Sequence, residues 1–164
     1  MAVFVPVLIM RYPAPRSFNG PFSSGPFANP YTDKSRGTMT RILVVEDSRT
    51  QRHLMAGLLT DQGFQVQTAR DGLQALERVS SFGPEIIILD VLMPELNGYE
   101  VCRRLKRQPQ TQNIRVLFCS SQSSESDRYW ALKQGGDAYL VKPFPPKMLV
   151  EMVQDLAQRI SKGS

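Results

Sequence analysis

Side chains that could act together on a phosphoryl group follow four short apolar runs of this 164-residue chain. In chain order they are Glu46, Asp47, Asp90, Ser120 and Lys142. Three carboxylates in one pocket would repel one another, which raises the cost of ionising all of them. A divalent cation relieves that repulsion, and Mg²⁺ favours a few carboxylates together with water and phosphate oxygens. A lysine and a hydroxyl across the pocket would suit a phosphoryl group.

Asp90 is the most informative of these residues because it ends the uninterrupted apolar run 86–89. Such a run is typical of a strand buried on both faces in a parallel sheet. A charge at its end must reach solvent or meet compensating groups, since an isolated buried carboxylate is costly. Asp90 is therefore either a strand terminator or a group placed for chemistry. The matching polar groups after the other strands favour chemistry.

Five strands alternating with five helices are predicted to hold these residues in place. We expect strands at residues 42–45, 64–68, 86–89, 115–119 and 138–141. The pattern indicates an α/β fold with a doubly wound, five-stranded parallel sheet. In the flavodoxin-like order 2-1-3-4-5, the first and third strands are neighbours where ligands bind, beyond the carboxyl ends.

The helices are predicted from apolar periodicity and from capping residues. We expect the first over 48–61, the second from Asp71, the third after Asn97, the fourth near 125–134, and a fifth with the clearest period. The expected apolar faces of the first two are Leu54, Met55, Leu58 and Leu59, then Leu73, Leu76 and Val79. The fourth helix is short and weakly amphipathic, so Tyr129 and Trp130 are candidates for a docking surface.

These motifs resemble the receiver domain of bacterial two-component response regulators, CheY-like proteins, over residues 40–161. The resemblance rests on the acidic pair Glu46-Asp47, Asp90 with Met93-Pro94 and Gly98, Ser120, and Lys142-Pro143-Phe144. Each fragment is weak by itself, but all of them occur at consecutive strand ends with receiver-like spacing.

The resemblance implies that Asp90 accepts a phosphoryl group from a sensor histidine kinase or a phosphotransfer protein. It further implies Mg²⁺ as the cofactor and an output through phosphorylation-dependent contacts with another protein. The implied roles are Mg²⁺ ligation by Glu46, Asp47, Asp90 and the Leu92 carbonyl, phosphoryl pairing by Lys142, switching by Ser120 and Tyr139, and a cis Lys142–Pro143 bond. Such a protein is not a conventional enzyme, and only catalyses its own phosphorylation and dephosphorylation.

A few positions depart from the family's commoner residues. Glu46 and Ser120 stand where Asp and Thr are more frequent, and Ser121 replaces a small Ala or Gly. Leu92 and Gln122 flank the path of the hydrolytic water in receivers, and an apolar Leu92 offers that water no hydrogen bond.

Three other functions compete with a phosphorylated receiver. A phosphatase of the haloacid dehalogenase type needs a second acid at the position of Leu92. A flavodoxin-like carrier needs a hydroxyl- and glycine-rich loop where Glu46 and Asp47 stand. A pseudo-receiver that only binds proteins is the more serious alternative, and it predicts an eroded acidic site, which the sequence does not show.

Residues 1–39 are predicted to be a disordered leader, and residues 40–161 the receiver domain. The first 38 residues hold six of the twelve prolines and four of the eight phenylalanines, without helical or strand periodicity. Met39 directly precedes the first strand and is an alternative translation start. These 38 residues carry four basic groups and one acid, while the remainder carries sixteen and fourteen. The basic balance therefore lies in the leader, and we expect no nucleic-acid partner.

The remaining expectations concern environment and assembly. Cys102 and Cys119 lack C-x-x-C spacing, which fits reduced thiols and a cytoplasmic location. No apolar stretch reaches the length of a membrane span, so we expect no membrane insertion. We expect a monomer or weak dimer. Because the chain stops soon after the fifth helix, it most resembles single-domain regulators of chemotaxis or type IV pilus motility.

Overall fold

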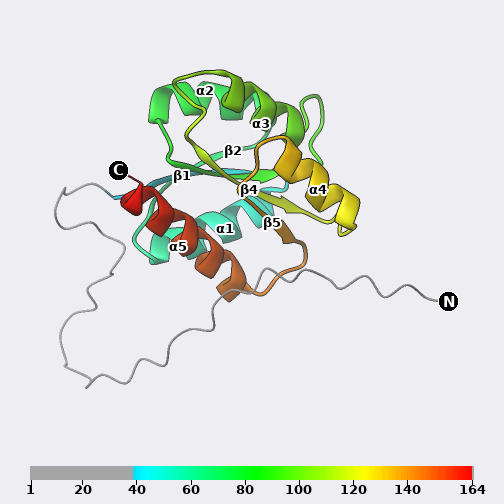
Figure 1. The fold of residues 1–164 in the computed structure, drawn as a ribbon. Helices are drawn as coiled ribbons and strands as arrows, with labels where there is room; N and C mark the ends of the chain where they lie inside the picture. Colours follow the sequence, from blue (N-terminus) through cyan, green and yellow to red (C-terminus); the bar gives the residue numbers. More distant parts are fainter. Residues whose placement is uncertain (1–38, 164) are drawn as a thin grey trace, which may run out of the picture.

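The computed structural model describes residues 39–163, in which five strands alternate with five helices (Figure 1). The elements are β1 (Arg41–Val45), α1 (Arg49–Asp61), β2 (Gln65–Ala69), α2 (Gly72–Phe82), β3 (Ile86–Asp90), α3 (Gly98–Arg107), β4 (Arg115–Ser120), α4 (Glu125–Lys133), β5 (Ala138–Val141) and α5 (Pro146–Lys162). The expected leader lies outside the described residues, apart from Met39. No helix within 39–163 has the length and apolarity that a membrane crossing requires.

The strands form one parallel sheet in the order β2-β1-β3-β4-β5, which confirms the predicted topology. The order reverses at β1 and β3, which pair from Ile42 opposite Ile86 to Val45 opposite Leu89. In Figure 1, α1 and α5 cover one face of the sheet, and α2 and α3 cover the other.

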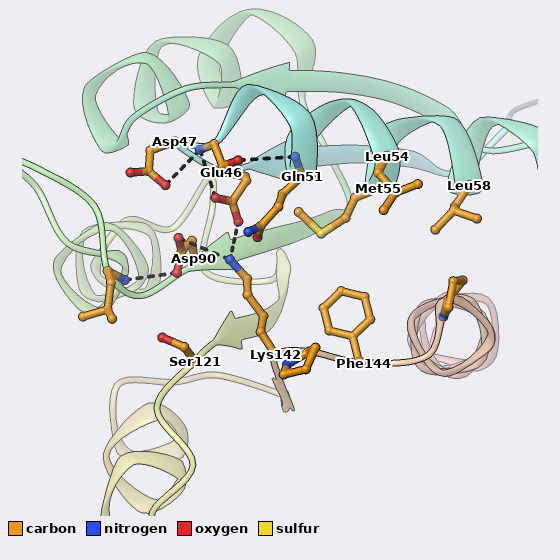
Figure 2. A pocket seen from close by; sticks show the side chains of 14 residues that line it. Glu46, Asp47, Gln51, Leu54, Met55, Leu58, Asp90, Ser121, Lys142 and Phe144 are labelled. Carbon is orange, nitrogen blue, oxygen red and sulfur yellow. Dashed lines mark hydrogen bonds and ion pairs between the residues drawn. The ribbon is translucent and has the colours of Figure 1, made fainter.

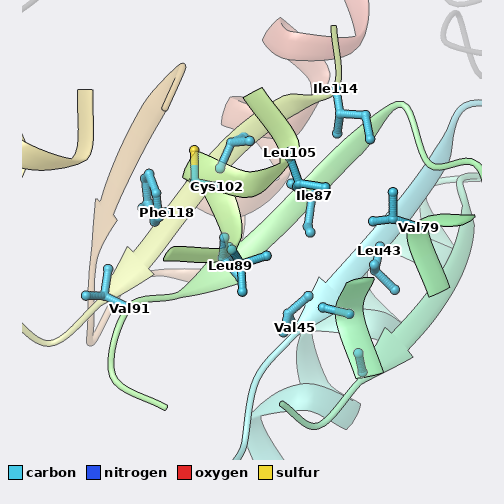
Figure 3. Close-up of a cluster of buried hydrophobic side chains, with 14 of the residues drawn as sticks. Leu43, Val45, Val79, Ile87, Leu89, Val91, Cys102, Leu105, Ile114 and Phe118 are labelled. Carbon is cyan, nitrogen blue, oxygen red and sulfur yellow. The ribbon is translucent and has the colours of Figure 1, made fainter. Parts of the chain in front are cut away.

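Alternate strand residues enter two separate hydrophobic cores. Leu43 and Val45 of β1 pack with α2 and α3 in the first core, which Figure 3 shows. Ile42 and Val44 point to the opposite face and pack with α1 and α5. Every residue of β3 is buried, which confirms that the apolar run before Asp90 is a strand covered on both faces.

Side-chain caps fix where four helices begin. Ser48, Asp71, Asn97 and Ser124 each accept a hydrogen bond from the backbone N–H three residues ahead. Such caps satisfy a backbone donor that has no partner within the helix. Each cap follows the carboxyl end of a strand, so the helices start at the edge of the sheet where the polar side chains lie.

Two expected core leucines are exposed instead. Leu54 and Leu73 are 59% and 50% exposed, whereas Met55 and Val79 on the same helices are buried. The buried stripe of α1 follows Met55 and Leu59 at a spacing of four residues, and Leu54 lies beside that stripe. The prediction for α1 was wrong because an apolar run of neighbouring residues leaves the phase of a helix ambiguous. β2 also begins one residue later than predicted, at Gln65.

Candidate functional site

The polar residues singled out in the sequence meet at one edge of the sheet. Asp90 pairs in register with Cys119, the residue before Ser120, and Ser120 pairs with Val141, the residue before Lys142. Parallel strands present their carboxyl ends at the same edge, and this edge is where open α/β sheets bind ligands. The predicted convergence of strand ends is therefore present in the fold.

Three carboxylates form a cluster at this edge (Figure 2). Glu46, Asp47 and Asp90 offer oxygens that all lie within 4.8 Å of one another. Glu46 and Asp90 are buried, with only 1% and 5% of their surface exposed, while Asp47 faces solvent. The site thus has two buried anions and one open side through which a ligand can enter.

Lys142 supplies the positive charge that the buried carboxylates need. Its ammonium forms an ion pair with Glu46, and it lies 3.4 Å from Asp90 Oδ2. Burial alone would lower the pKa of Lys142, but the hydrogen bond to Glu46 and the charge of Asp90 leave that pKa raised. The lysine is therefore firmly protonated, and one cation faces three carboxylates.

Burial raises the pKa of Asp90 and of Glu46, and Lys142 only partly offsets that effect. A folded carboxyl with a raised pKa holds its proton at a pH where the unfolded chain has lost it. The free energy of unfolding therefore falls as pH rises through the interval between the unfolded and folded pKa values. Ionising the buried Asp90 and Glu46 at neutral pH therefore costs folding free energy, and a bound cation would offset part of that cost.

The backbone around Asp90 is shaped to keep its carboxylate in place. The Leu92 N–H donates to Asp90 Oδ1 at 3.1 Å. Gly98 packs against the same segment, and a Cβ there would lie 2.2 Å from the Asp90 carbonyl oxygen. No side chain fits at that distance, so glycine is required where α3 begins. The predicted metal contact of the Leu92 carbonyl stays a prediction.

A cleft of about 620 Å³ opens over the acidic cluster and continues along α1. Beyond the charged residues, apolar side chains line it: Leu54, Met55, Leu58, Phe144 and Pro146. Figure 2 shows Phe144 facing Met55 across this cleft. The Lys142–Pro143 bond is cis, as the resemblance implied. The exposed leucine on α1 thus belongs to the wall of a cleft that begins at Asp90.

Ser120 and Tyr139 are joined through one backbone segment. The Gln122 N–H donates to Ser120 Oγ at 3.2 Å, and Tyr139 donates its hydroxyl proton to the Gln122 carbonyl at 2.9 Å. Ser120 is fully buried and Tyr139 is partly buried. The resemblance implied switch roles for both residues, which stay predictions, but the sequence gave no sign that the backbone of Gln122 connects them.

Tyr99 extends this connection to α4, and the sequence reasoning missed it. Its ring meets Phe118 edge-on at 5.4 Å, and the Tyr139 ring lies 6.5 Å from the same Phe118. The Tyr99 hydroxyl donates to the Asp127 carbonyl on α4 at 3.3 Å. Aromatic contacts thus run from β5 through β4 to α3, and a hydrogen bond continues to α4.

Exposed apolar side chains gather on α4, the helix for which the sequence suggests a docking surface. Tyr129 and Trp130 on α4 are each 57% exposed, and Leu132 beside them is 53% exposed. Only Ala131 of α4 is buried, so this helix presents apolar side chains to solvent.

Comparison with known proteins identifies the fold and the family. The family model of the response regulator receiver domain matches residues 42–154. The chemotaxis protein CheY4 of Vibrio cholerae is 31% identical, with a TM-score of 0.70, over 73% of this chain and 99% of that one. The response regulator MprA of Mycobacterium ulcerans (strain Agy99) is 39% identical over 119 residues, 73% of this chain and 50% of that protein.

A doubly wound sheet with an acidic cluster at its switch point defines a CheY-like domain. The chain belongs to the response regulator receiver domain family. It spans about half the length of the curated relatives it matches, which include a probable transcriptional regulator, ycf27, of Porphyridium aerugineum at 34% identity. The family is one of signalling domains in two-component systems and not a conventional enzyme family.

Proposed function

We propose that Asp90 accepts a phosphoryl group and that the modified domain signals through protein–protein contacts. The observation that carries the proposal is the cluster of Glu46, Asp47 and Asp90 facing Lys142 at the edge of the sheet. Incubation of the full chain with acetyl phosphate and Mg²⁺, followed by intact-mass measurement, tests it. A single phosphoryl adduct is expected.

The residues of the chain have distinct tasks in this transfer. An Asp90 carboxylate oxygen forms a bond to phosphorus while the bond between phosphorus and the donor atom breaks. For a histidine donor, that atom is an imidazole nitrogen. The leaving imidazole keeps the electron pair of the broken bond. The Leu92 N–H orients Asp90, and Lys142 is placed to stabilise the added negative charge. Asp90 must be ionised to attack, so Lys142 also favours the reactive form.

Mg²⁺ is the proposed cofactor because every donor expected at the site is an oxygen, from three carboxylates and the Leu92 carbonyl. Three carboxylates within 4.8 Å of one another suit a hard divalent cation and not a soft one. Bound there, the ion would neutralise charge on the carboxylates and on the phosphoryl oxygens. Glu46, Asp47 and Asp90 would hold it.

Asp47→Ala is expected to weaken Mg²⁺ binding at least tenfold, because it removes a ligand and leaves the nucleophile in place. Calorimetric titration of the full chain with MgCl₂ measures this. Asp61→Ala, which removes an acid from the far end of α1, is the matched control and should bind like the wild type. Equal affinity in Asp47→Ala and the control would remove Asp47 from the metal site.

The cleft along α1 is the proposed docking site for the histidine kinase or phosphotransfer protein. A donor must bring its histidine to Asp90, and the apolar wall of Leu54 and Leu58 continues from that point. The exposed leucine gives a partner apolar area to bury, which drives association.

Leu54→Arg is expected to slow phosphotransfer from the cognate donor protein by tenfold or more, and to leave labelling by acetyl phosphate unchanged. A small donor needs no docking wall, whereas a buried arginine at a protein interface carries a desolvation cost. Leu73→Arg, which changes another exposed leucine on α2, controls for added charge. If both variants transfer at the wild-type rate, the donor docks on another surface.

The choice between a phosphorylated receiver and a pseudo-receiver rests on the acidic cluster. A pseudo-receiver has no use for buried Glu46 and Asp90, whose burial has an energetic cost. Retention of this cluster with Lys142 therefore supports regulation by phosphorylation. Two free, buried cysteines fit a reducing cytoplasm, which is the location we propose.

The output pathway is proposed only as a class. The relatives include a chemotaxis protein and a probable transcriptional regulator, so the receiver is shared by more than one kind of output. Chemotaxis or pilus motility remains our proposal for this chain, with a protein as the direct target.

A further inference from the structure

Arg52 on α1 contacts the segment that carries two of the proposed metal ligands. Its Nη1 donates to the Glu46 carbonyl at 2.7 Å and to the Asp47 carbonyl at 3.2 Å. β1 ends at Val45, so these carbonyls lie beyond the β1–β3 ladder. One guanidinium nitrogen therefore bridges two successive peptide groups at the point where the strand becomes a loop.

The backbone of this loop sets the direction of both carboxylates. The Ser48 N–H donates to Glu46 Oε1 at 3.0 Å and to Asp47 Oδ1 at 2.9 Å. Figure 2 shows Glu46 and Asp47 side by side at the head of α1, close to Asp90. Repulsion among three carboxylates acts to spread the loop, and the two bonds from Arg52 oppose that movement.

From this geometry we infer that Arg52 is a positioning residue for the proposed Mg²⁺ site. It acts through the backbone, because both of these hydrogen bonds go to the carbonyls of Glu46 and Asp47 and not to their carboxylates. Partners that orient metal ligands typically change metal affinity by about 10- to 100-fold when removed. The inference rests on the proposed function, because it needs a divalent cation at Glu46, Asp47 and Asp90.

A purely electrostatic role and a positioning role for Arg52 predict opposite changes in Mg²⁺ affinity when Arg52 is removed. The inference is therefore testable. A positive charge near a cation site repels the cation, so removing it should strengthen Mg²⁺ binding if Arg52 acts through charge alone. If Arg52 holds the loop, removing it should weaken binding, because the ligands must be ordered when the ion arrives. Arg49 is exposed in the first turn of the same helix and provides a matched charge.

The experiment is calorimetric titration of the full chain with MgCl₂ for the wild type, Arg52→Met, Arg52→Lys and Arg49→Met. We expect Arg52→Met to bind Mg²⁺ about tenfold more weakly, while Arg49→Met binds as tightly as the wild type or slightly more tightly. Arg52→Lys should recover part of the loss, since an ammonium can still donate to one carbonyl. Melting midpoints measured without Mg²⁺ identify variants that are folded.

Each outcome has one interpretation. Arg52→Met binding as tightly as Arg49→Met, or more tightly, would overturn the inference and leave only an electrostatic role. If Arg52→Met does not fold, Arg52→Lys decides, and wild-type affinity in that variant overturns the positioning role. A wild-type chain that binds no Mg²⁺ would contradict the proposed function itself, which separates the two failures.

Discussion

Asp90→Asn is expected to abolish the phosphoryl adduct that acetyl phosphate forms on the wild type. Asn keeps the shape of the side chain but offers no carboxylate nucleophile. The Leu92 N–H can still donate to the amide oxygen, so the loop geometry is retained. Intact-mass measurement after equal incubation with acetyl phosphate and Mg²⁺ reports the adduct directly.

The same variant should not lower the melting midpoint at neutral pH. Burial raises the pKa of Asp90, so the ionised side chain is less stable in the fold than in the unfolded chain. A neutral amide removes that cost and relieves repulsion with Asp47 and Glu46. If a folded Asp90→Asn chain is still labelled to the wild-type yield, the phosphoryl acceptor is another residue, and the assignment of Asp90 is wrong. Glu46→Gln is the comparison, since it neutralises the other buried acid and keeps the nucleophile.

Sequence patterns predicted the polar site at the strand ends because residue type indicates which side chains are apolar and buried and which are charged. A four-residue apolar run before Asp90 indicates a strand covered on both faces, and the alternation of strands with helices indicates a parallel sheet that helices cover. The strand order 2-1-3-4-5 comes from the flavodoxin-like fold, and in that order Asp90 lies near Glu46. The resemblance to receivers added the roles of these residues.

Backbone contacts and helix phase were not predictable in the same way. The carbonyls that Arg52 and Tyr139 contact belong to every residue type, so no side-chain pattern marks them. Leu54 was expected in the core because neighbouring leucines on α1 fit two helical phases equally well. Tertiary packing chose Met55 and Leu59 and left Leu54 at the cleft.

The second large effect concerns the route of the output signal, which we expect to start at Ser120. Ser120 is the last residue of β4. Its hydroxyl oxygen accepts a hydrogen bond from the Gln122 N–H, and the Gln122 carbonyl accepts one from the Tyr139 hydroxyl. A new phosphoryl group on Asp90 would attract the Ser120 hydroxyl, because a dianion favours donors. Movement of that hydroxyl would disturb the segment around Gln122. It would thereby weaken the hydrogen bond from Tyr139 to the Gln122 carbonyl. We therefore expect the added charge at Asp90 to change the surface that the domain presents to a partner.

α4 is the element best placed to respond to this change. Only Ala131 of the helix is buried, and the Tyr99 hydroxyl bond to Asp127 ties its first turn to α3. Few buried contacts mean a low cost of local movement. The exposed Tyr129 and Trp130 are of the kind that anchor interfaces, so a shifted α4 would present a different docking surface.

Ser120→Ala is therefore expected to accept the phosphoryl group at Asp90 but to lose most of the response in α4. Hydrogen exchange with and without beryllofluoride, a phosphoryl mimic, should change most over residues 120–142 in the wild type. In Ser120→Ala that change should fall by more than half, because no hydroxyl remains to pull the Gln122 segment. Ser123→Ala removes an exposed hydroxyl from the same loop and should respond like the wild type. A wild-type response confined to α1 and α2 would show that the output leaves by another face, and Ser120 and Tyr139 would not be its switch.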